Sequence, residues 1–434
     1  MSKNNITRKK FLKTTGILFG GATVAASAPN FMNAQSINIH KDEPIPLDVP
    51  KDKIRLGMIG NGQRYVDQIV PAISYLPNFE VIACADVIPA RLENGLKYSA
   101  PNAKGYKDYR KLLENKDLDA VVVCTPLKFH YDIAKDAISA GKHVVCEKPM
   151  TYTIEQAIKL EQLVLENPKL AFRVPHDYRA ITIHAEVKNI IQQGLLGKIT
   201  HIEGRWDGFN NWRREVIDPN FAELINWRLS TKYCGGLMTE LMAHQIDLVN
   251  YMVGLPNPIK AMSSGSIRYW KDERTTFDNV HTIYEYPDGL IGTFSANRAS
   301  HYEGAYIKIY GERATIEVNF NNDWQTATIT PNQKFKDTAD EVDAITSATA
   351  VETNDPKKKG IETFDEEFYS YKGVMHPFNI GTMFGYAHFS KMIVEGAKPD
   401  ISVTDGKRAA IAAHIANLSN RNNTVEYWKP EYGV

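Results

Sequence analysis

Short apolar runs and helical patterns alternate along residues 53–150. The apolar runs are residues 53–59, 79–85, 120–124 and 143–146, and between the first two an amphipathic helix is indicated by apolar residues at 66, 69, 70, 73 and 76. Strands that are apolar on both faces belong to parallel sheets whose two faces are covered by helices. The pattern therefore predicts an N-terminal α/β domain built on a parallel, doubly wound sheet.

A different pattern follows from about residue 198. Strand-like runs cover residues 199–206, 280–286, 290–297, 305–310 and 314–318, and Pro287-Asp288-Gly289 is a hairpin turn. Residues 237–253 have helical spacing, whereas residues 320–380 are polar and irregular and receive no assignment. We therefore expect a second, C-terminal α+β domain after the first one.

The N-terminus has the layout of an export signal. Cationic residues 7–13 precede a mildly apolar stretch, residues 16–28, that ends in Ala-Ser-Ala. The cationic run resembles a twin-arginine signal with Lys9 in place of the second arginine, and the alternative is a basic tail. The stretch is too short and too rich in small residues for a stable membrane span. We expect a signal peptide over residues 1–35, a linker over residues 36–52, and a periplasmic or otherwise exported protein.

Composition narrows the class of partner. The 434 residues carry 51 Lys and Arg against 51 Asp and Glu, so the formal net charge is zero and no basic field favours nucleic acid. The four cysteines, Cys84, Cys124, Cys146 and Cys234, show no metal-binding spacing, and we interpret them as small core residues. No cluster of His, Cys and Asp has metal spacing either, so we predict no metal.

A glycine-rich turn follows the first apolar run. It reads Gly60-Asn61-Gly62-Gln63-Arg64-Tyr65. In a Rossmann turn of this kind the first glycine permits the bend, and the second lets the backbone approach a pyrophosphate at the N-terminus of the next helix. Tyr65 stands where the third glycine normally allows close packing of that helix, so we expect the helix to lie farther out or at a different angle. Residues 60–64 are predicted to bind a dinucleotide.

Asp86 ends the second strand, 86 − 60 = 26 positions after the first glycine. A carboxylate at this point can accept hydrogen bonds from the adenosine ribose and would repel a 2′-phosphate, which favours NAD over NADP. The alternative is that Asp86 caps the following helix. The next two strands end at Thr125 and at Glu147-Lys148, and ligands of parallel sheets bind beyond such ends.

Several further stretches resemble the glucose-fructose oxidoreductase / inositol dehydrogenase family (Gfo/Idh/MocA). They are the turn at residues 59–62, Cys124-Thr125-Pro126 with His130, residues 140–149 with Glu147-Lys148-Pro149, Gly235-Gly236 with His244 and Asp247, Asp278-Asn279-Val280, and residues 393–410. The resemblance spans residues 53 to about 420. It implies a Rossmann domain over residues 53–175 that binds NAD, with NADP less favoured, and holds it tightly.

The same resemblance implies the rest of the organisation. Residues 176–400 would form a substrate and oligomerisation domain with an open, mostly antiparallel sheet that packs against another subunit as a homo-oligomer. Residues 401–434 would form a C-terminal helix and a tail that pack back on the Rossmann domain.

Glu240 and His244 stand four residues apart on the predicted helix, so their side chains share one face. A carboxylate beside an imidazole can fix its tautomer, as a proton-transfer histidine requires, although an ordinary polar helix face is the alternative. By resemblance, His244 and Lys148 are the catalytic residues, and Glu240 takes an acidic position. Lys148 would hold a sugar hydroxyl beside the nicotinamide. Asp247 would be a structural partner or a surface residue.

Other residues fall at family positions. Glu147 is expected on the nicotinamide side of the cofactor site, with a strand-end ion pair as the alternative. Thr125 and His130 are expected near the cofactor, although His130 could equally be a capping or core histidine. A last group is suited to bind a carbohydrate substrate, because aromatic faces stack on sugars: His176, Tyr178, Asn210, Trp212 and Arg213.

The resemblance leaves three functions open. The first is an NAD(P)-dependent oxidoreductase that acts on a sugar, a sugar derivative or a cyclitol. The second is a glycoside hydrolase that uses NAD transiently to form a keto-sugar and then eliminates the aglycone, which suits export because its cofactor is regenerated in each turnover. An oxidoreductase that recycles its cofactor between two sugars suits export equally well. The third is an NAD-binding protein without catalysis, against which the presence of Lys148, Glu240 and His244 argues.

Overall fold

The computed structural model describes residues 45–321, 326–332, 358–361, 366–371 and 373–433, with Lys334 and Glu341 as isolated positions. The predicted signal peptide and most of the predicted linker lie outside the described residues. Among the helices that are described, none combines the length and the hydropathy needed to cross a bilayer.

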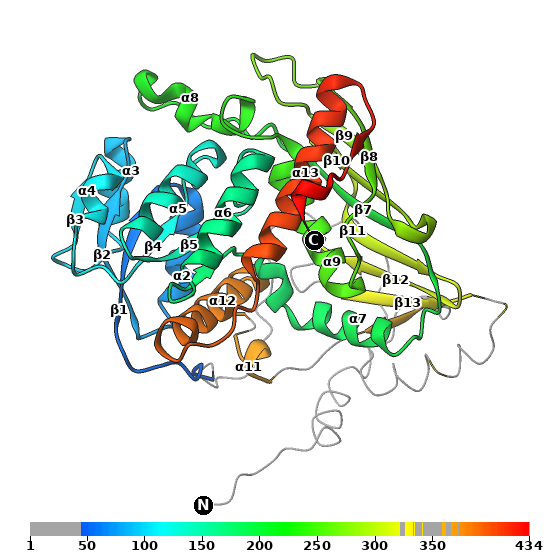
Figure 1. The fold of residues 1–434 in the computed structure, drawn as a ribbon, viewed down its shortest axis with the longest axis horizontal. Helices are drawn as coiled ribbons and strands as arrows, with labels where there is room; N and C mark the ends of the chain where they lie inside the picture. The colour runs from blue at the N-terminus through cyan, green and yellow to red at the C-terminus, as the bar shows by residue number, and fades with distance from the viewer. Residues whose placement is uncertain are drawn as a thin grey trace, which may run out of the picture. The chain divides into compact units, whose positions relative to one another are not determined.

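The N-terminal part is a parallel sheet of six strands in the order β3-β2-β1-β4-β5-β6 (Figure 1). The strands are β1 (Ile54–Ile59), β2 (Phe79–Ala85), β3 (Lys104–Tyr106), β4 (Ala120–Val123), β5 (His143–Cys146) and β6 (Phe172–Arg173). Between them lie η1 (Arg64–Ile69), α2 (Val70–Ile73), α3 (Pro89–Leu96), α4 (Tyr109–Leu113), η2 (Leu127–Phe129), α5 (His130–Ser139) and α6 (Ile154–Glu166). Every residue of β4 is buried, as expected for a strand covered on both faces. The predicted doubly wound Rossmann architecture is confirmed.

The C-terminal part is a mixed, mostly antiparallel sheet of nine strands in the order β14-β13-β12-β11-β7-β10-β9-β8-β15. Among the described strands of this second sheet, only the β7–β10 pair is parallel. The strands are β7 (Ile199–Phe209), β8 (Lys260–Ser266), β9 (Asn279–Glu285), β10 (Ile291–Asn297), β11 (Ala299–Gly311), β12 (Ala314–Asn319), β13 (Thr326–Pro331), β14 (Lys359–Ile361) and β15 (Glu426–Tyr427). The turn η7 (Pro287–Gly289) joins β9 to β10, as predicted.

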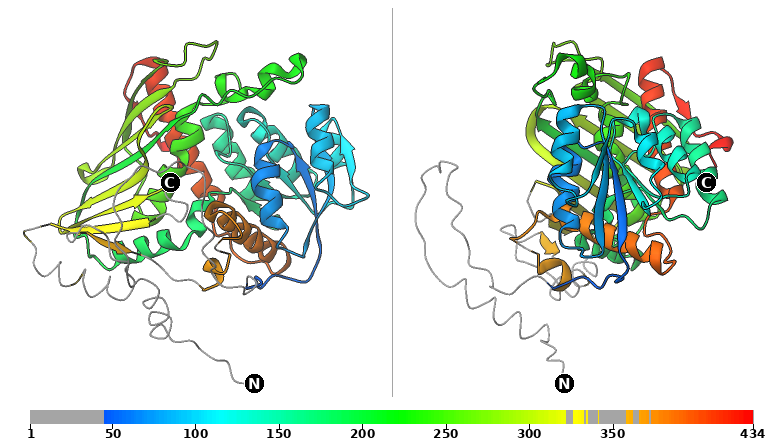
Figure 2. Two further views of the ribbon diagram at one scale, coloured as in Figure 1. Left: turned by 180° about the vertical axis from the view of Figure 1, so that it is seen from behind. Right: turned by 90° about the vertical axis from the view of Figure 1, so that its left-hand side faces the viewer.

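Helices cover one face of this second sheet. They include η3 (Asp177–Ala180), α7 (Thr182–Gln192), η6 (Met238–Met242), α9 (Ala243–Val253) and α13 (Val403–Asn422), and Figure 2 shows α13 between the sheet and the Rossmann part. Exposed and buried residues alternate along β9, so its other face is open to solvent. The segment between β7 and η6 carries the short elements η4 (Pro219–Phe221), α8 (Ala222–Ile225) and η5 (Trp227–Leu229).

Two helices near the C-terminus connect the two sheets. The first, α12 (Pro377–Val394), packs against η1 and α2 of the Rossmann part, and α11 (Glu366–Tyr369) precedes it. The second, α13, packs against α6 as well as against α9 and β8. The tail after α13 adds β15 to the edge of the second sheet and ends in η8 (Pro430–Tyr432). Residues 366–371 and 377–380, which the sequence left unassigned, thus begin the elements that reach the Rossmann part.

Candidate active site

Gly60 makes the turn after β1 possible. Its φ is +91°, and a Cβ at this residue would lie 2.7 Å from the carbonyl carbon and oxygen of Cys124. No larger residue fits there, because both the backbone angle and the neighbouring strand exclude it. At Gly62 a Cβ would meet nothing closer than a guanidinium nitrogen of Arg91 at 4.0 Å, so that side of the turn is open.

The missing third glycine is accommodated by a change of helix type. Tyr65 is fully buried, and residues 64–69 form a π-helical turn before the α-helix begins at Val70. The wider turn admits the tyrosine ring to the core next to Cys84. The first turn of this helix is therefore widened, whereas the expected outward position or different angle of the helix stays a prediction.

Asp86 binds two backbone amides. One carboxylate oxygen accepts from the Asn61 amide at 2.7 Å and the other from the Ile88 amide at 2.9 Å, immediately before α3. Burial raises the pKa of this carboxyl group. Asp86 therefore joins the glycine turn to the segment before α3 while it lines the cavity; the N-cap of α3 is Ile88 and not Asp86, and the contact of Asp86 with the ribose stays a prediction. The Asn61 side chain is buried against Gly95 and does not line the cavity, so only its backbone belongs to the site.

A cavity of about 880 Å³ lies over the glycine turn and the carboxyl ends of β1, β2 and β4. From the Rossmann part it is lined by residues 59, 60 and 62–64, 85–88, 91, 107–110, 124–126, 129, 132 and 133. Among the predicted cofactor residues, Thr125 has a buried hydroxyl that finds no hydrogen-bond partner in the described part of the chain. The open side of Gly62, the cavity and this unpaired hydroxyl all fit a dinucleotide laid across the strand ends.

Arg64 and Glu147, two of the predicted cofactor residues, already bind other side chains of the protein. The Arg64 guanidinium pairs with Glu147 and, at 2.9 Å, with Asp177, and it donates to Gln68 at 2.6 Å. The nearby carboxylates keep Arg64 protonated, since they raise its pKa against the effect of burial. The predicted alternative for Glu147, a strand-end ion pair, is therefore present. Arg64 lines the cavity but serves as a structural cation.

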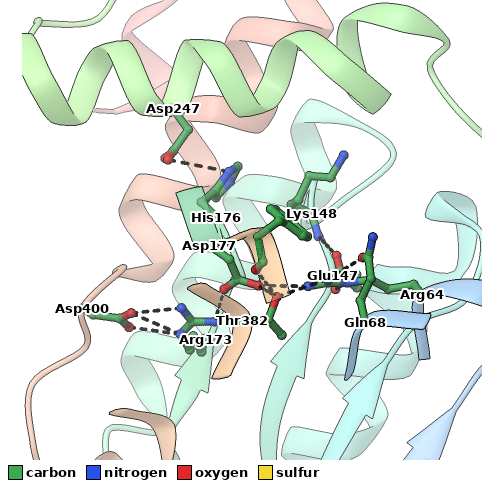
Figure 3. Close-up of polar contacts among 11 residues, drawn as sticks. Arg64, Gln68, Glu147, Lys148, Arg173, His176, Asp177, Asp247, Thr382 and Asp400 are labelled. Atoms are coloured by element: carbon green, nitrogen blue, oxygen red, sulfur yellow. Dashed lines mark hydrogen bonds and ion pairs between the residues drawn. The ribbon is translucent and has the colours of Figure 1, made fainter. Parts of the chain in front are cut away.

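This ion pair is part of a buried network (Figure 3). Asp177 also accepts from Arg173 at 2.9 Å and from the Thr382 hydroxyl at 2.8 Å, and Arg173 pairs with Asp400 at 3.0 Å. The network connects η1, the end of β5, η3, α12 and the segment before α13. The network fixes the Glu147 side chain just beyond the carboxyl end of β5, directly before Lys148.

Both ring nitrogens of His130 lie against backbone carbonyl oxygens, Nδ1 at 3.0 Å from Pro149 and Nε2 at 2.8 Å from Thr125. Burial lowers the pKa of this histidine. The alternative of a core histidine describes it best, because it braces the ends of β4 and β5 behind the cofactor cavity.

Lys148 follows β5 and points toward the second part of the chain. Its Nζ donates to the backbone oxygen of Glu240 at 2.7 Å. Burial lowers the pKa of Lys148 to about 8, although Glu240 and Glu147 oppose the shift. An amine with this pKa is divided between its charged and neutral forms near neutral pH, so it can both give and take a proton.

His244 stands on α9 within an aromatic enclosure. The ring centroids of Tyr178, Trp206 and Phe378 lie 5.2, 6.0 and 6.2 Å from its own. Its Nδ1 is buried and has no hydrogen-bond partner among the described residues. Burial, followed by the nearby charge of Lys148, lowers the pKa of His244 well below its usual value. His244 is therefore a neutral imidazole that can exchange hydrogen bonds with a ligand.

The predicted pairing of Glu240 with His244 is wrong. Glu240 lies on the π-helical turn η6 and His244 on α9, and a π-helix does not bring residues four apart onto one face as an α-helix does. The Glu240 carboxylate accepts instead from Nε of Arg228 at 3.0 Å. Both residues nevertheless line one cavity. Glu240 contributes its backbone oxygen to Lys148 and its charge to the site.

The predicted substrate residues separate into two groups. Tyr178 lines the cavity that holds Lys148 and His244. His176 is only 1% exposed and lies behind the cavity, with Nδ1 at 3.7 Å from Asp247 and its ring against His244. Asp247 is held by both arms of Arg179, at 2.8 and 2.6 Å, so it is the structural partner that we considered.

The other predicted substrate residues lie elsewhere. Trp212 lines the cofactor cavity, between the guanidinium groups of Arg228 and Arg298. Arg213 pairs with Asp272 at 3.1 Å and lines neither cavity, and the Asn210 side chain accepts from the Trp212 amide. The interpretation of these residues as a sugar platform is therefore not supported. Cys124 lines both cavities, contrary to the interpretation of all four cysteines as core residues, whereas the other three are buried.

The second cavity, of about 660 Å³, also contains residues that sequence reasoning missed. They are Asp67 and Gln68 of η1, Trp206 of β7, Arg214, Trp227 and Arg228 of the segment before η6, and His376, Phe378 and Asn379 at the start of α12. The sequence could have indicated Trp227 and Arg228, because an aromatic and a cationic residue stand side by side shortly before Gly235-Gly236. The residues of α12 gave no signal, because they follow a stretch without recognisable periodicity.

Within the described part of the chain, no three His, Cys, Asp or Glu side chains are arranged to hold a metal ion. The site residues themselves, an amine, an imidazole and a carboxylate bound by arginine, are groups for proton transfer and hydrogen bonding.

Comparison with known proteins gives two matches to family models. Residues 54–175 match the model described as "Oxidoreductase family, NAD-binding Rossmann fold", and residues 184–317 match the GFO/IDH/MocA C-terminal domain. Levoglucosan dehydrogenase of Pseudarthrobacter phenanthrenivorans is 25% identical over 340 residues, which cover 70% of this chain and 78% of that protein. Glycosyl hydrolase family 109 protein 1 of Bacteroides thetaiotaomicron is 29% identical over 265 residues, 56% of this chain and 55% of that protein.

Solved structures share the fold. A levoglucosan dehydrogenase in complex with NADH and levoglucosan superposes with a TM-score of 0.69 at 18% identity, over 87% of this chain and 99% of that one. The WlbA dehydrogenase from Bordetella pertussis, in complex with NADH and UDP-GlcNAcA, gives 0.68 at 17% identity, over 88% and 99%. Each of the two family models matches one part of the described fold. The chain therefore belongs to the Gfo/Idh/MocA family of oxidoreductases with an NAD-binding Rossmann fold.

Proposed function

We propose that this protein is an NAD-dependent oxidoreductase that acts on a secondary hydroxyl of a sugar, a sugar derivative or a cyclitol. The observation that carries the proposal is the meeting of Lys148 and His244 in one cavity that shares residues 63, 64, 124 and 125 with the cofactor cavity. Bound NAD supplies a hydride acceptor. The protein supplies the groups that hold the hydroxyl and move its proton.

Lys148 and His244 divide this work. The neutral form of Lys148 takes the hydroxyl proton as the carbinol carbon is oxidised, and its ammonium form returns a proton in the reverse direction. The neutral His244 orients the hydroxyl by a hydrogen bond. Tyr178, Trp206 and Trp227 supply apolar ring faces for the C–H surface of a sugar, and the names of two similar dehydrogenases, levoglucosan dehydrogenase and WlbA with its bound UDP-GlcNAcA, support a carbohydrate.

A glycoside hydrolase is the second candidate. Similarity to the glycosyl hydrolase family 109 proteins supports it, since one is 29% identical over 265 residues. A ring carbon would then pass a hydride to bound NAD while Lys148 and His244 handle the hydroxyl proton, so that the aglycone leaves by elimination, water adds, and the hydride returns to the carbon. No free NAD is consumed in such a cycle, which suits the exported protein that the signal-like residues 1–35 suggest.

One experiment separates the candidates. The purified full-length protein is incubated with aryl glycosides and with free sugars, while aglycone release and nicotinamide absorbance are followed together. Growth of NADH with added NAD and a free sugar, without aglycone release, supports the oxidoreductase. Aglycone release without net NADH supports the hydrolase and refutes the simple dehydrogenase. Absence of both activities over a broad panel, with NAD bound, would favour the third candidate, a binding protein without catalysis.

Two further expectations belong with this proposal. We propose that residues 1–35 direct export, which a fusion of this segment to a reporter active only in the periplasm would test.

We also propose that the open face of the second sheet packs against another copy of the chain, because Met262 and Ile283 are each 40% exposed on it. Sedimentation of the native protein and of an Ile283→Asp variant tests this: a monomeric native protein would refute it.

A further inference from the structure

One segment of the C-terminal part extends over the cofactor cavity. After β7, residues 210–229 leave the second sheet, and α8 reaches over the Rossmann part (Figures 1 and 2). Nine of its residues line the 880 Å³ cavity: Trp212, Arg214, Glu215, Ile217, Leu224, Ile225, Asn226, Trp227 and Arg228. The cavity therefore has one wall from the Rossmann part and an opposite wall from this segment, which we name the clasp (residues 212–228).

The clasp is held in place by its own hydrogen bonds. The backbone amide of Arg214 donates to the Asn226 side chain at 2.7 Å, and its carbonyl accepts from the same side chain at 3.1 Å. At the base, Arg213 pairs with Asp272, and the carbonyl of Asn211 accepts from Arg274 at 2.9 Å. Hydrogen bonds thus join the beginning of the clasp to its end, and the ion pair and the hydrogen bond at its base attach it to the residues before β9. The residues that face the cavity are therefore held in position before any ligand binds.

Two arginines line the cofactor cavity, one from each wall. Arg214 comes from the clasp and Arg91 from α3, and among the described residues neither side chain has a hydrogen bond or an ion pair to a neighbour. Arg91 approaches the open side of Gly62. Burial lowers the pKa of Arg91, the charge of Asp86 raises it, and the charge of Arg214 lowers it further. Two cations without an ion pair within 4 Å among the described residues, both on the walls of the cavity above the glycine turn, are suited to neutralise a pyrophosphate there.

The clasp also presents apolar side chains to this cavity. Ile217 is 66% exposed although it lines the cavity, whereas Leu224 is partly buried and Ile225 is buried in the same lining. An exposed aliphatic residue on the wall of a cavity this size is suited to an apolar ligand surface such as the face of adenine.

We propose that the clasp retains the dinucleotide, with Arg214 and Arg91 neutralising the pyrophosphate and Ile217 and Leu224 covering the adenosine. The cofactor then stays on the protein through repeated turnovers. A reduced cofactor has to be reoxidised in place, either by a second carbonyl substrate or by the later half of the same turnover. The proposal rests on the NAD-binding fold and is independent of which sugar reacts.

Cofactor exchange tests it directly. The full-length protein is loaded with isotope-labelled NAD, freed of excess by gel filtration, and chased with unlabelled NAD, so that the rate of label loss is measured without any substrate. Arg214→Ala should accelerate loss at least tenfold and weaken its dependence on salt, and Ile217→Ala should accelerate it about fivefold. Arg214→Lys should restore part of the retention, because it keeps the charge.

Matched controls come from exposed residues outside both cavities. Arg268→Ala and Ile259→Ala should exchange NAD within twofold of the native rate. Far-UV circular dichroism of each variant shows whether it is folded, because loss of bound NAD would by itself lower the unfolding temperature. The clasp is exposed enough that Arg214→Ala and Ile217→Ala should leave the spectrum unchanged. Exchange at the same rate in the native protein and all variants would overturn the proposal, and so would rapid loss of NAD from the native protein during gel filtration.

Discussion

If Lys148 accepts the hydroxyl proton as proposed, the pH dependence of substrate oxidation should follow the protonation state of its amine. Its pKa is lowered from 10.5 to about 8, a difference that corresponds to a penalty of about 3 kcal/mol on the ammonium form. At pH 7 about one-tenth of Lys148 is then neutral, against about 0.03% of an ordinary lysine. Burial thus enriches the proton-accepting form by about 300-fold at neutral pH.

The direction in which kcat/KM changes with pH depends on which protonation form of Lys148 is active. Oxidation needs the neutral amine, so kcat/KM should rise by about 90-fold from pH 6 to pH 9 and level off above about pH 8. Reduction of the ketone product needs the ammonium, so its kcat/KM should fall over the same range. Initial rates of both directions at subsaturating substrate, with saturating nicotinamide cofactor, measure this. Lys148→Ala should lose a factor of about 10² to 10⁴ and the inflection near pH 8.

Glu240 offers a sharper perturbation. Its charge raises the pKa of Lys148, so Glu240→Gln should move the inflection to lower pH, and Glu166→Gln, an exposed change far from the site, should leave it in place. A profile without an inflection between pH 7 and pH 9, or an inflection that survives in Lys148→Ala, would refute the assignment of Lys148 as the proton acceptor.

Three further changes test the site and its support. Gly60→Ala should cost about 3 kcal/mol of unfolding free energy in urea, whereas Gly141→Ala, also at positive φ but with open space around its Cβ, should cost about 1 kcal/mol; equal costs would show that the contact with Cys124 is unimportant. Asp86→Ala should weaken NAD binding about tenfold by calorimetry and reduce the preference over NADP, and an unchanged preference would contradict its position beside the ribose. Asp177→Asn should cost about 3–5 kcal/mol, since it leaves Arg64 and Arg173 with less compensating charge, while the exposed Asp117→Asn should change the unfolding free energy by less than 1 kcal/mol; similar values for both would mean that the buried network adds little.

Local sequence patterns were sufficient for the skeleton of the Rossmann part. The first four long strands, the turn after β1 and the positions of Asp86 and Lys148 at strand ends were all predicted. Each depends on a property of a few consecutive residues, such as two-sided apolarity or a glycine that tolerates positive φ. The short edge strand β3 escaped prediction, because three residues carry no periodicity.

Side-chain partners followed a different logic. Spacing along the chain suggested that Glu240 supports His244, but the π-helical turn redirects Glu240 to Arg228, twelve residues earlier. Likewise His176 was predicted to touch substrate, yet it is buried between Asp247 and His244. Local spacing assumes a regular helix and says nothing about which distant group fills the space beside a side chain.

The amino-acid sequence by itself determined the family, the parallel sheet and the residues with catalytic potential, because these are written in short contiguous patterns. Only the tertiary structure decided which of them meet: the arginine network that occupies Arg64 and Glu147, the contribution of α12 to the second cavity, and the clasp over the first. The physical reason is that a pKa, an ion pair or a cavity wall depends on burial and on neighbours up to hundreds of residues away, and neither is encoded in the periodicity of one segment.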